Sequence, residues 1–99
     1  MDKPLDPPFA EIGARLKNLR LAIGKSQGMN RAISQAALCR KTGIKPNRWN
    51  QYEKGKREIT KKALMLLDEH YSVSLDWVLK GDVGGMPARL ADQLPLAAE

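Results

Sequence analysis

The chain has 99 residues, with 17 lysines and arginines against 11 acidic residues, and a formal net charge of +6. Its length suits one domain with a modest core, and its single cysteine, Cys39, excludes an intramolecular disulfide. One cysteine and one histidine do not make a structural zinc site, and no apolar run approaches a membrane span or a secretory signal. We expect a soluble, intracellular protein without metal or cofactor.

The positive charge is concentrated in one third of the chain. Residues 31–62 carry ten basic and two acidic side chains, a local charge of +8, whereas the rest of the chain sums to −2. A basic surface confined to part of a small protein suggests a polyanionic partner such as nucleic acid. A merely solvated basic face is the alternative, and charge alone does not separate the two.

The first third of the chain predicts an arm, a helix and a loop. Three prolines in the first eight residues predict an extended arm over residues 1–8. Apolar residues then recur at steps of three and four, which predicts an amphipathic helix that Gly24 is placed to end. These apolar residues are Phe9, Ile12, Leu16, Leu19 and Ile23. The stretch 25–33 has no clean period and is interpreted as a long loop.

Four further short helices are predicted downstream. Ser34 can cap a helix that ends at Gly43, and Pro46 suits the first position of a helix over about 46–54. Thr60 and Ser74 can cap two more helices, which run to about residues 71 and 80. The remaining residues, 82–99, contain glycines, two prolines and few apolar anchors, so we expect a mostly mobile tail. No alternating strand pattern appears, which predicts an all-α fold.

Two of these helices, joined by a short turn that contains glycine, form a helix-turn-helix pattern. At 100° per residue, the helix over about 46–54 places its bulky aromatic residues on one side and amide side chains on the other. Amides can donate to and accept from adenine together, and asparagine is a poor helix former, so we interpret the amide face as base-reading. A chance cluster of amides is the alternative.

These residues resemble the lambda-repressor-like, or XRE-type, helix-turn-helix family. The matching motifs are SQxxLCxxxGI over 34–44, WxxYExGK over 49–56 and VSLDWVLxG over 73–81. The resemblance implies a five-helix DNA-binding domain over residues 9–81. Compared with the family pattern, about eight residues, 26–33, look inserted, so we expect an extended loop between the first and second helices. That loop is interpreted as a passive insertion, with contacts to DNA flanks or to a partner as the alternative.

The resemblance also implies roles for individual side chains. The third helix is expected to enter the major groove of double-stranded DNA, and Pro46, which has no donor, can make only apolar base contacts. The base-reading candidates are Pro46, Asn47, Arg48, Asn50 and Gln51. The phosphate-contacting candidates are Ser34, Gln35, Lys45, Lys54, Lys56 and Arg57. Glu53 is expected to form a partly buried ion pair with Arg20 of the first helix.

A homodimer on a palindromic operator is expected, because one short recognition helix reads only a few base pairs. The fifth helix has four apolar residues in five positions, more than one core-facing stripe can bury. Trp77 fits the core, so the predicted dimer interface consists of Leu75, Val78 and Leu79. The alternative is a monomer in which these residues cover the fourth helix.

The leading functional interpretation is a sequence-specific transcriptional repressor, bacterial or phage-derived, that acts on DNA in the cytoplasm. An antitoxin that binds both its own promoter and a toxin protein is the alternative, although a short tail with few apolar anchors favours the repressor. An enzyme is not expected, because the chain has one histidine, one cysteine and no glycine-rich phosphate loop. A protein-interaction module that has lost DNA binding should lack basic charge around the third helix, whereas this sequence is strongly basic there.

Overall fold

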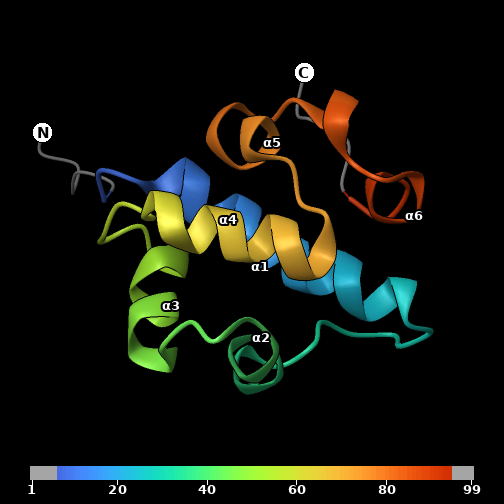
Figure 1. Ribbon diagram of the computed structural model, residues 1–99, viewed down its shortest axis with the longest axis horizontal. Coiled ribbons are helices and arrows are strands. Elements are labelled where there is room, and N and C mark those ends of the chain that lie inside the picture. Colours follow the sequence, from blue (N-terminus) through green and yellow to red (C-terminus); the bar gives the residue numbers. More distant parts are fainter. Residues whose placement is uncertain (1–6, 95–99) are drawn as a thin grey trace, which may run out of the picture.

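The computed structural model describes residues 7–94, and every regular element among them is a helix (Figure 1). The order is α1 (Ala10–Ser26), α2 (Gln35–Thr42), α3 (Pro46–Glu53), α4 (Lys61–Tyr71), α5 (Leu75–Lys80), the 3₁₀ turn η1 (Val83–Gly85) and α6 (Ala88–Ala91). The all-α prediction and the extended loop between α1 and α2 are confirmed. Most of the predicted N-terminal arm, residues 1–6, lies outside the described residues.

The longest helix, α1, is the scaffold on which the other helices pack. Its most extensive contacts are with α3, α5 and α6, while α2 packs on α3 and α4 packs on α2 and α5. In Figure 1, α2 and α3 lie together along the lower edge, and α5 and α6 lie along the upper edge. Three residues on one stripe of α1, Leu16, Leu19 and Ile23, are at most 1% exposed and form the centre of the core. This stripe follows the predicted helical periodicity.

The helix starts use the predicted caps. The hydroxyl groups of Ser34, Thr60 and Ser74 accept hydrogen bonds from the backbone N–H groups three residues ahead, at 3.0, 3.1 and 3.4 Å. Helix α3 begins differently, because Lys45 makes no side-chain cap and Pro46 occupies the first turn. A proline there loses no helical hydrogen bond and has a preset φ, so it can start the helix without a capping side chain.

Gly24 does not end α1 as the sequence predicts. The helix continues to Ser26, and Gly24 is buried within it. A Cβ atom at Gly24 would lie 1.9 Å from the carbonyl oxygen of Arg31, so this glycine allows the following loop to pass directly over the helix. The left-handed residue that turns the chain is instead Gly28, with φ of +84°. Hydrogen bonds from Met29 N to Gly24 O (2.9 Å) and from Ile33 N to Arg20 O (3.1 Å) hold the loop against α1.

The structure also differs from the mostly mobile tail predicted over 82–99. Residues 82–94 form η1 and α6, and α6 packs on α1. Met86, Leu90 and Leu94 are all buried, Leu90 to 2% exposure. A spacing of four residues is typical of a helix, but this short segment is stable only because it packs on the apolar surface of α1. Residues 95–99 lie outside the described part of the chain.

Val78 is a wrong prediction as a dimer-interface residue. Its side chain is 0% exposed, and its carbonyl oxygen accepts a hydrogen bond from Arg15 of α1 at 3.0 Å. A partner therefore could not contact its side chain in this structure. The other two candidates remain accessible: Leu75 is half-buried and Leu79 is 45% exposed. Trp77 is buried, as predicted from its place in the sequence.

Among residues 7–94, no helix combines the length and the apolar character that crossing a membrane requires.

The packing of the loop on α1 predicts an unusual response to Gly24→Ala. Inside a helix, replacing glycine by alanine ordinarily stabilises a protein by about 0.5–1 kcal/mol. Here the added methyl group would overlap the Arg31 carbonyl, and we expect a loss of about 1–3 kcal/mol in the free energy of unfolding. Urea denaturation measures it, with Lys25→Ala at the neighbouring exposed position as the control. A stabilised Gly24→Ala variant would contradict this close approach.

Candidate nucleic-acid interface

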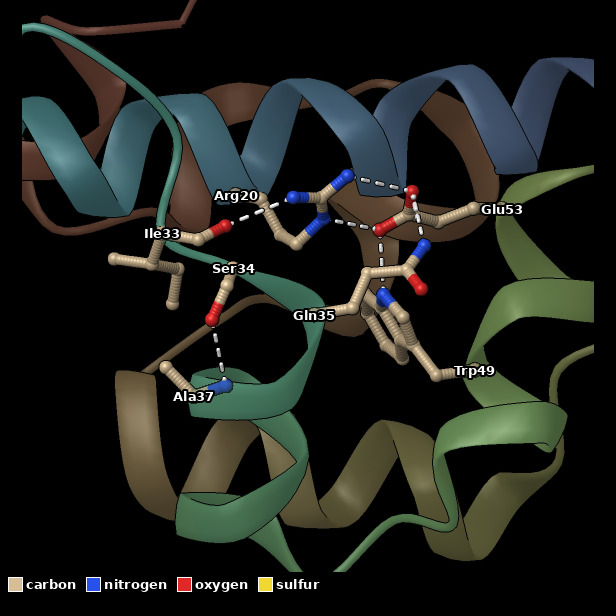
Figure 2. A network of polar contacts seen from close by, with 7 residues as sticks. All are labelled: Arg20, Ile33, Ser34, Gln35, Ala37, Trp49 and Glu53. Carbon is tan, nitrogen blue, oxygen red and sulfur yellow. Dashed lines mark hydrogen bonds and ion pairs between the residues drawn. The ribbon is translucent and has the colours of Figure 1, made fainter.

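A buried carboxylate at the end of α3 joins three helices. Glu53 is 4% exposed, yet it receives hydrogen bonds from α1, α2 and α3 (Figure 2). Arg20 Nη2 and Gln35 Nε2 donate to its Oε1 atom at 2.9 and 3.0 Å. Arg20 Nε and the indole N–H of Trp49 donate to its Oε2 atom. The expected ion pair between Arg20 and Glu53 is thus present, as part of a wider network.

Arg20 extends this network to the loop that precedes α2. Its Nη1 atom donates to the carbonyl oxygen of Ile33 at 2.8 Å, and the Ile33 N–H donates back to the Arg20 carbonyl at 3.1 Å. The next residue, Ser34, caps α2. One guanidinium group therefore fixes both the entry into α2 and the end of α3.

The hydrogen bonds keep Glu53 ionised despite its burial. Desolvation by burial raises the pKa of this carboxyl group, but the hydrogen bonds from Arg20, Gln35 and Trp49, with the charge of Arg20, outweigh it, so the pKa lies below its ordinary value. A buried ion pair contributes little net stability compared with apolar packing, whereas removal of one partner is strongly destabilising. The network consequently specifies how the helices are placed more than it stabilises them.

The turn between α2 and α3 is built from local hydrogen bonds. Gly43 has φ of +82°, and its N–H donates to the carbonyl oxygen of Cys39 at 2.8 Å. Thr42 is buried, and its hydroxyl donates to the Leu38 carbonyl and accepts from the N–H of Ile44. Ile44 is buried as well, which anchors the turn in the core.

Helix α3 has a buried face and an exposed face. Trp49 and Tyr52 are at most 2% exposed, and their rings pack edge to face with centroids 6.4 Å apart. The opposite side, which we call the reading face, consists of the five base-reading candidates. Pro46, Asn47 and Gln51 are exposed there, while Arg48 and Asn50 are half-buried. Asn47 and Gln51 therefore point outward on the same side of α3, Arg48 and Asn50 lie on its two flanks, and Pro46 lies in its first turn.

The phosphate-contacting candidates fall into two groups beside α3. Lys45 precedes the helix, and Lys54, Lys56 and Arg57 follow it; all four are exposed. The other two candidates lie at the start of α2, where Ser34 is exposed and Gln35 is half-buried, with its amide nitrogen donating to Glu53.

The hydrogen bonds from Gln35 and Trp49 to Glu53 were not predicted from the sequence, and neither were two further contacts of this region. One is the bond from Arg20 to the Ile33 carbonyl, for which the inserted loop gives no pattern. The other is a hydrogen bond from Arg57 Nε to Gln51 Oε1, at 3.0 Å, between a phosphate-contacting and a base-reading candidate. The motif around Gly55 could have indicated that the chain reverses after α3 and returns towards Gln51.

Comparison with known protein families gives a match. A sequence model described as helix-turn-helix matches residues 16–78, more than half of the chain. No curated protein matches the sequence, and no solved structure does.

Replacing Arg20 by methionine tests the network. The substitution leaves Glu53 buried without its counter-charge, and removal of one partner of a buried pair costs roughly 3–5 kcal/mol. We expect a loss of that order in chemical denaturation. Glu11→Gln is the control, because it breaks a 3.7 Å pair with Arg15 in which the Glu11 side chain is 90% exposed, and such pairs contribute about 1 kcal/mol or less. Equal losses in the two variants would contradict the role given to Arg20.

The lowered pKa of Glu53 predicts a pH dependence with a definite sign. A carboxyl group with a lower pKa in the folded state stabilises the fold above its unfolded pKa, here near 4.5, and this contribution disappears as the pH falls through the folded value. The difference in unfolding free energy between wild type and Glu53→Gln should therefore shrink from pH 7 towards pH 3. Urea titrations across this range measure it, and a constant difference would contradict the prediction.

Proposed function

Since the chain belongs to the lambda-repressor-like, XRE-type helix-turn-helix family, we propose that this DNA-binding protein is a sequence-specific transcriptional repressor that binds its operator as a homodimer. The reading face of α3 is the observation that carries the proposal. Exposed amides on a helix whose other face is fully buried, with exposed lysines at both ends, suit a helix placed in the major groove.

The proposed base contacts come from the outermost residues of the reading face. Asn47 and Gln51 are four positions apart on α3, so they lie on the same side of the helix, and both are exposed. Each amide can make paired hydrogen bonds to a base edge. Asn50 and Arg48, which are half-buried, would contact bases or the adjoining backbone at the edges of the groove, and Pro46 would make an apolar contact.

The proposed phosphate contacts flank these residues. Lys45 lies ahead of the recognition helix, and Lys54 and Lys56 lie behind it, so α3 would be positioned between two segments of DNA backbone. Ser34 and Gln35 would contribute through the start of α2. Contacts of this kind fix the register of the protein on DNA and carry no sequence information by themselves.

The folded tail does not favour the antitoxin alternative. An antitoxin generally needs a segment that folds on its toxin. Residues 82–94 are instead packed on α1 and bury Met86, Leu90 and Leu94 within the protein itself.

DNA selection and binding measurements test the proposed function. Selection from a pool of random DNA duplexes should enrich one operator sequence. Asn47→Ala should weaken binding to that operator by roughly tenfold or more, with little effect on binding to random DNA. The double variant Lys54→Ala, Lys56→Ala should bind both the operator and random DNA more weakly. The slope of log affinity against log salt concentration, here called the salt slope, should become smaller in magnitude by about 0.9 for each phosphate that is no longer neutralised. Lys80→Ala on α5 is the control for charge. Failure to enrich any sequence would exclude a sequence-specific regulator.

The proposed dimer would use the two accessible apolar residues of α5, Leu75 and Leu79. Leu79 is 45% exposed and lies beside a hollow whose other lining residues include Pro8, Phe9 and Ile12. Leu75 is half-buried on the same helix. In a two-fold dimer the operator half-sites would lie about 34 Å apart, or a multiple of that distance.

Leu79→Asp tests the dimer without disturbing the core. We expect this variant to sediment as a monomer at concentrations where the wild type is dimeric, and to bind a palindrome more weakly. Met65→Asp is the matched control, because Met65 is another exposed apolar residue, 56% exposed, on α4. A wild-type monomer that binds one half-site as tightly as the full palindrome would contradict the dimer.

A further inference from the structure

We propose that Arg57 determines which base Gln51 recognises. By holding the Gln51 carboxamide in one orientation, Arg57 makes Gln51 prefer guanine to adenine at the operator position that it contacts. The inference rests on the proposed function and deepens it. Arg57 is predicted from the sequence to contact phosphate, but the structure places its side chain against a base-reading residue.

The backbone that carries Arg57 is fixed by the end of α3. The N–H of Gly55 donates to the carbonyl of Tyr52, and the N–H of Lys56 donates to the carbonyl of Gln51, both at 3.0 Å. This pair of bonds is a Schellman motif, and Gly55 supplies its left-handed residue with φ of +72°. The reversal returns the chain towards Gln51.

This turn is also clamped to the beginning of α1. The Phe9 N–H donates to the Gly55 carbonyl at 3.0 Å, and a Cβ atom on Gly55 would lie 2.8 Å from the Cα atom of Ala10. Arg57 therefore projects from a backbone that has little freedom to move away from α3. Its side chain is exposed, yet its starting point is part of the packed structure.

The hydrogen bond defines which end of the Gln51 amide faces Arg57. The Nε group of Arg57 lies 3.0 Å from Gln51 Oε1, and a guanidinium group can only donate. The atom that meets it must therefore be the carboxamide oxygen. The amide nitrogen, which can only donate, is left for the DNA.

This orientation favours one purine over the other. To read adenine, a glutamine uses both atoms: its oxygen accepts from N6, and its nitrogen donates to N7. With the oxygen turned towards Arg57, the tip of Gln51 presents N–H donors, and the guanidinium nitrogens beside it add more. Guanine offers two acceptors, O6 and N7, on the same edge, whereas the N6 amino group of adenine would face these donors.

This role differs from that of the neighbouring lysines. A lysine that contacts phosphate acts as a point charge, so its removal weakens binding to all sequences alike. Removal of Arg57 should instead change the sequence preference, since the freed Gln51 amide can rotate and use both of its atoms. The two roles thus give different results for DNA duplexes that differ at one base pair.

The experiment uses the selected operator and its single-base variants. The base pair read by Gln51 is first identified as the one at which Gln51→Ala loses discrimination. Affinities for the four bases at that position are then measured for wild type, Arg57→Ala and Arg57→Lys, with Lys56→Ala as the control. Both Arg57 and Lys56 are exposed, and unchanged melting temperatures verify that the variants fold.

The expected result is confined to one position. Wild type should prefer guanine to adenine by roughly tenfold, the discrimination that one good pair of hydrogen bonds supplies. In Arg57→Ala this ratio should fall to about one or reverse, while the other positions keep their preferences. Arg57→Lys should keep only part of the preference, because its flexible ammonium group can donate to Gln51 but lacks the planar fork of the guanidinium; it retains the charge and the salt slope. Lys56→Ala should weaken every duplex equally and leave the ratio unchanged.

Two results would overturn the inference. One is an Arg57→Ala variant that loses affinity by the same factor for all four bases, as Lys56→Ala does; the other is a wild-type preference for adenine at this position. In either case the protein would still bind its operator specifically, and the proposed function would stand. If no operator can be selected, the proposed function fails and this inference fails with it.

Discussion

The arrangement of α1, α2 and α3 depends on the charge of one buried carboxylate. Glu53 receives hydrogen bonds from Arg20, Gln35 and Trp49, which belong to three different helices. A carboxylate removed from water is strongly destabilising unless donors replace its hydration. Within the described residues no buried side-chain polar atom lacks a partner, so this requirement is met only when all three helices are correctly placed. The network thereby links the position of α3 to those of α1 and α2.

Helix α3 illustrates why such a constraint is needed. It has eight residues, lacks a side-chain cap and contains asparagines, so it would not be stable in isolation. Burial of Trp49 and Tyr52 and the bonds to Glu53 hold it in the fold, which leaves its outer side chains free to be chosen for recognition. Low helix propensity on the reading face is therefore tolerated because tertiary contacts stabilise the helix. The same rigidity would limit the conformational entropy lost when DNA binds.

The two edges of the molecule have different surface chemistry. The edge with α2 and α3 carries the amides and a group of exposed lysines and arginines. The opposite edge, with α5, η1 and α6 (Figure 1), carries the exposed apolar residues Leu79 and Val83. Helix α1 runs between the edges and contacts both α3 and α5. The proposed DNA surface and the proposed dimer surface are thus connected through one helix, so their relative orientation is set by the core.

Local sequence patterns were sufficient to predict α1 to α5, the N-terminal caps of α2, α4 and α5 and the helix-turn-helix spacing, because periodicity, Ser34, Thr60, Ser74 and Gly43 act within a few residues of the chain. Contacts between distant segments could be known only from the folded chain. The burial of Val78, the folding of residues 82–94 and the passage of the loop over Gly24 all depend on the surface of α1. The hydrogen bond from Arg57 to Gln51 depends likewise on a turn clamped to the start of α1. Local patterns identify which residues can face outward, but packing against a distant helix selects which of them do.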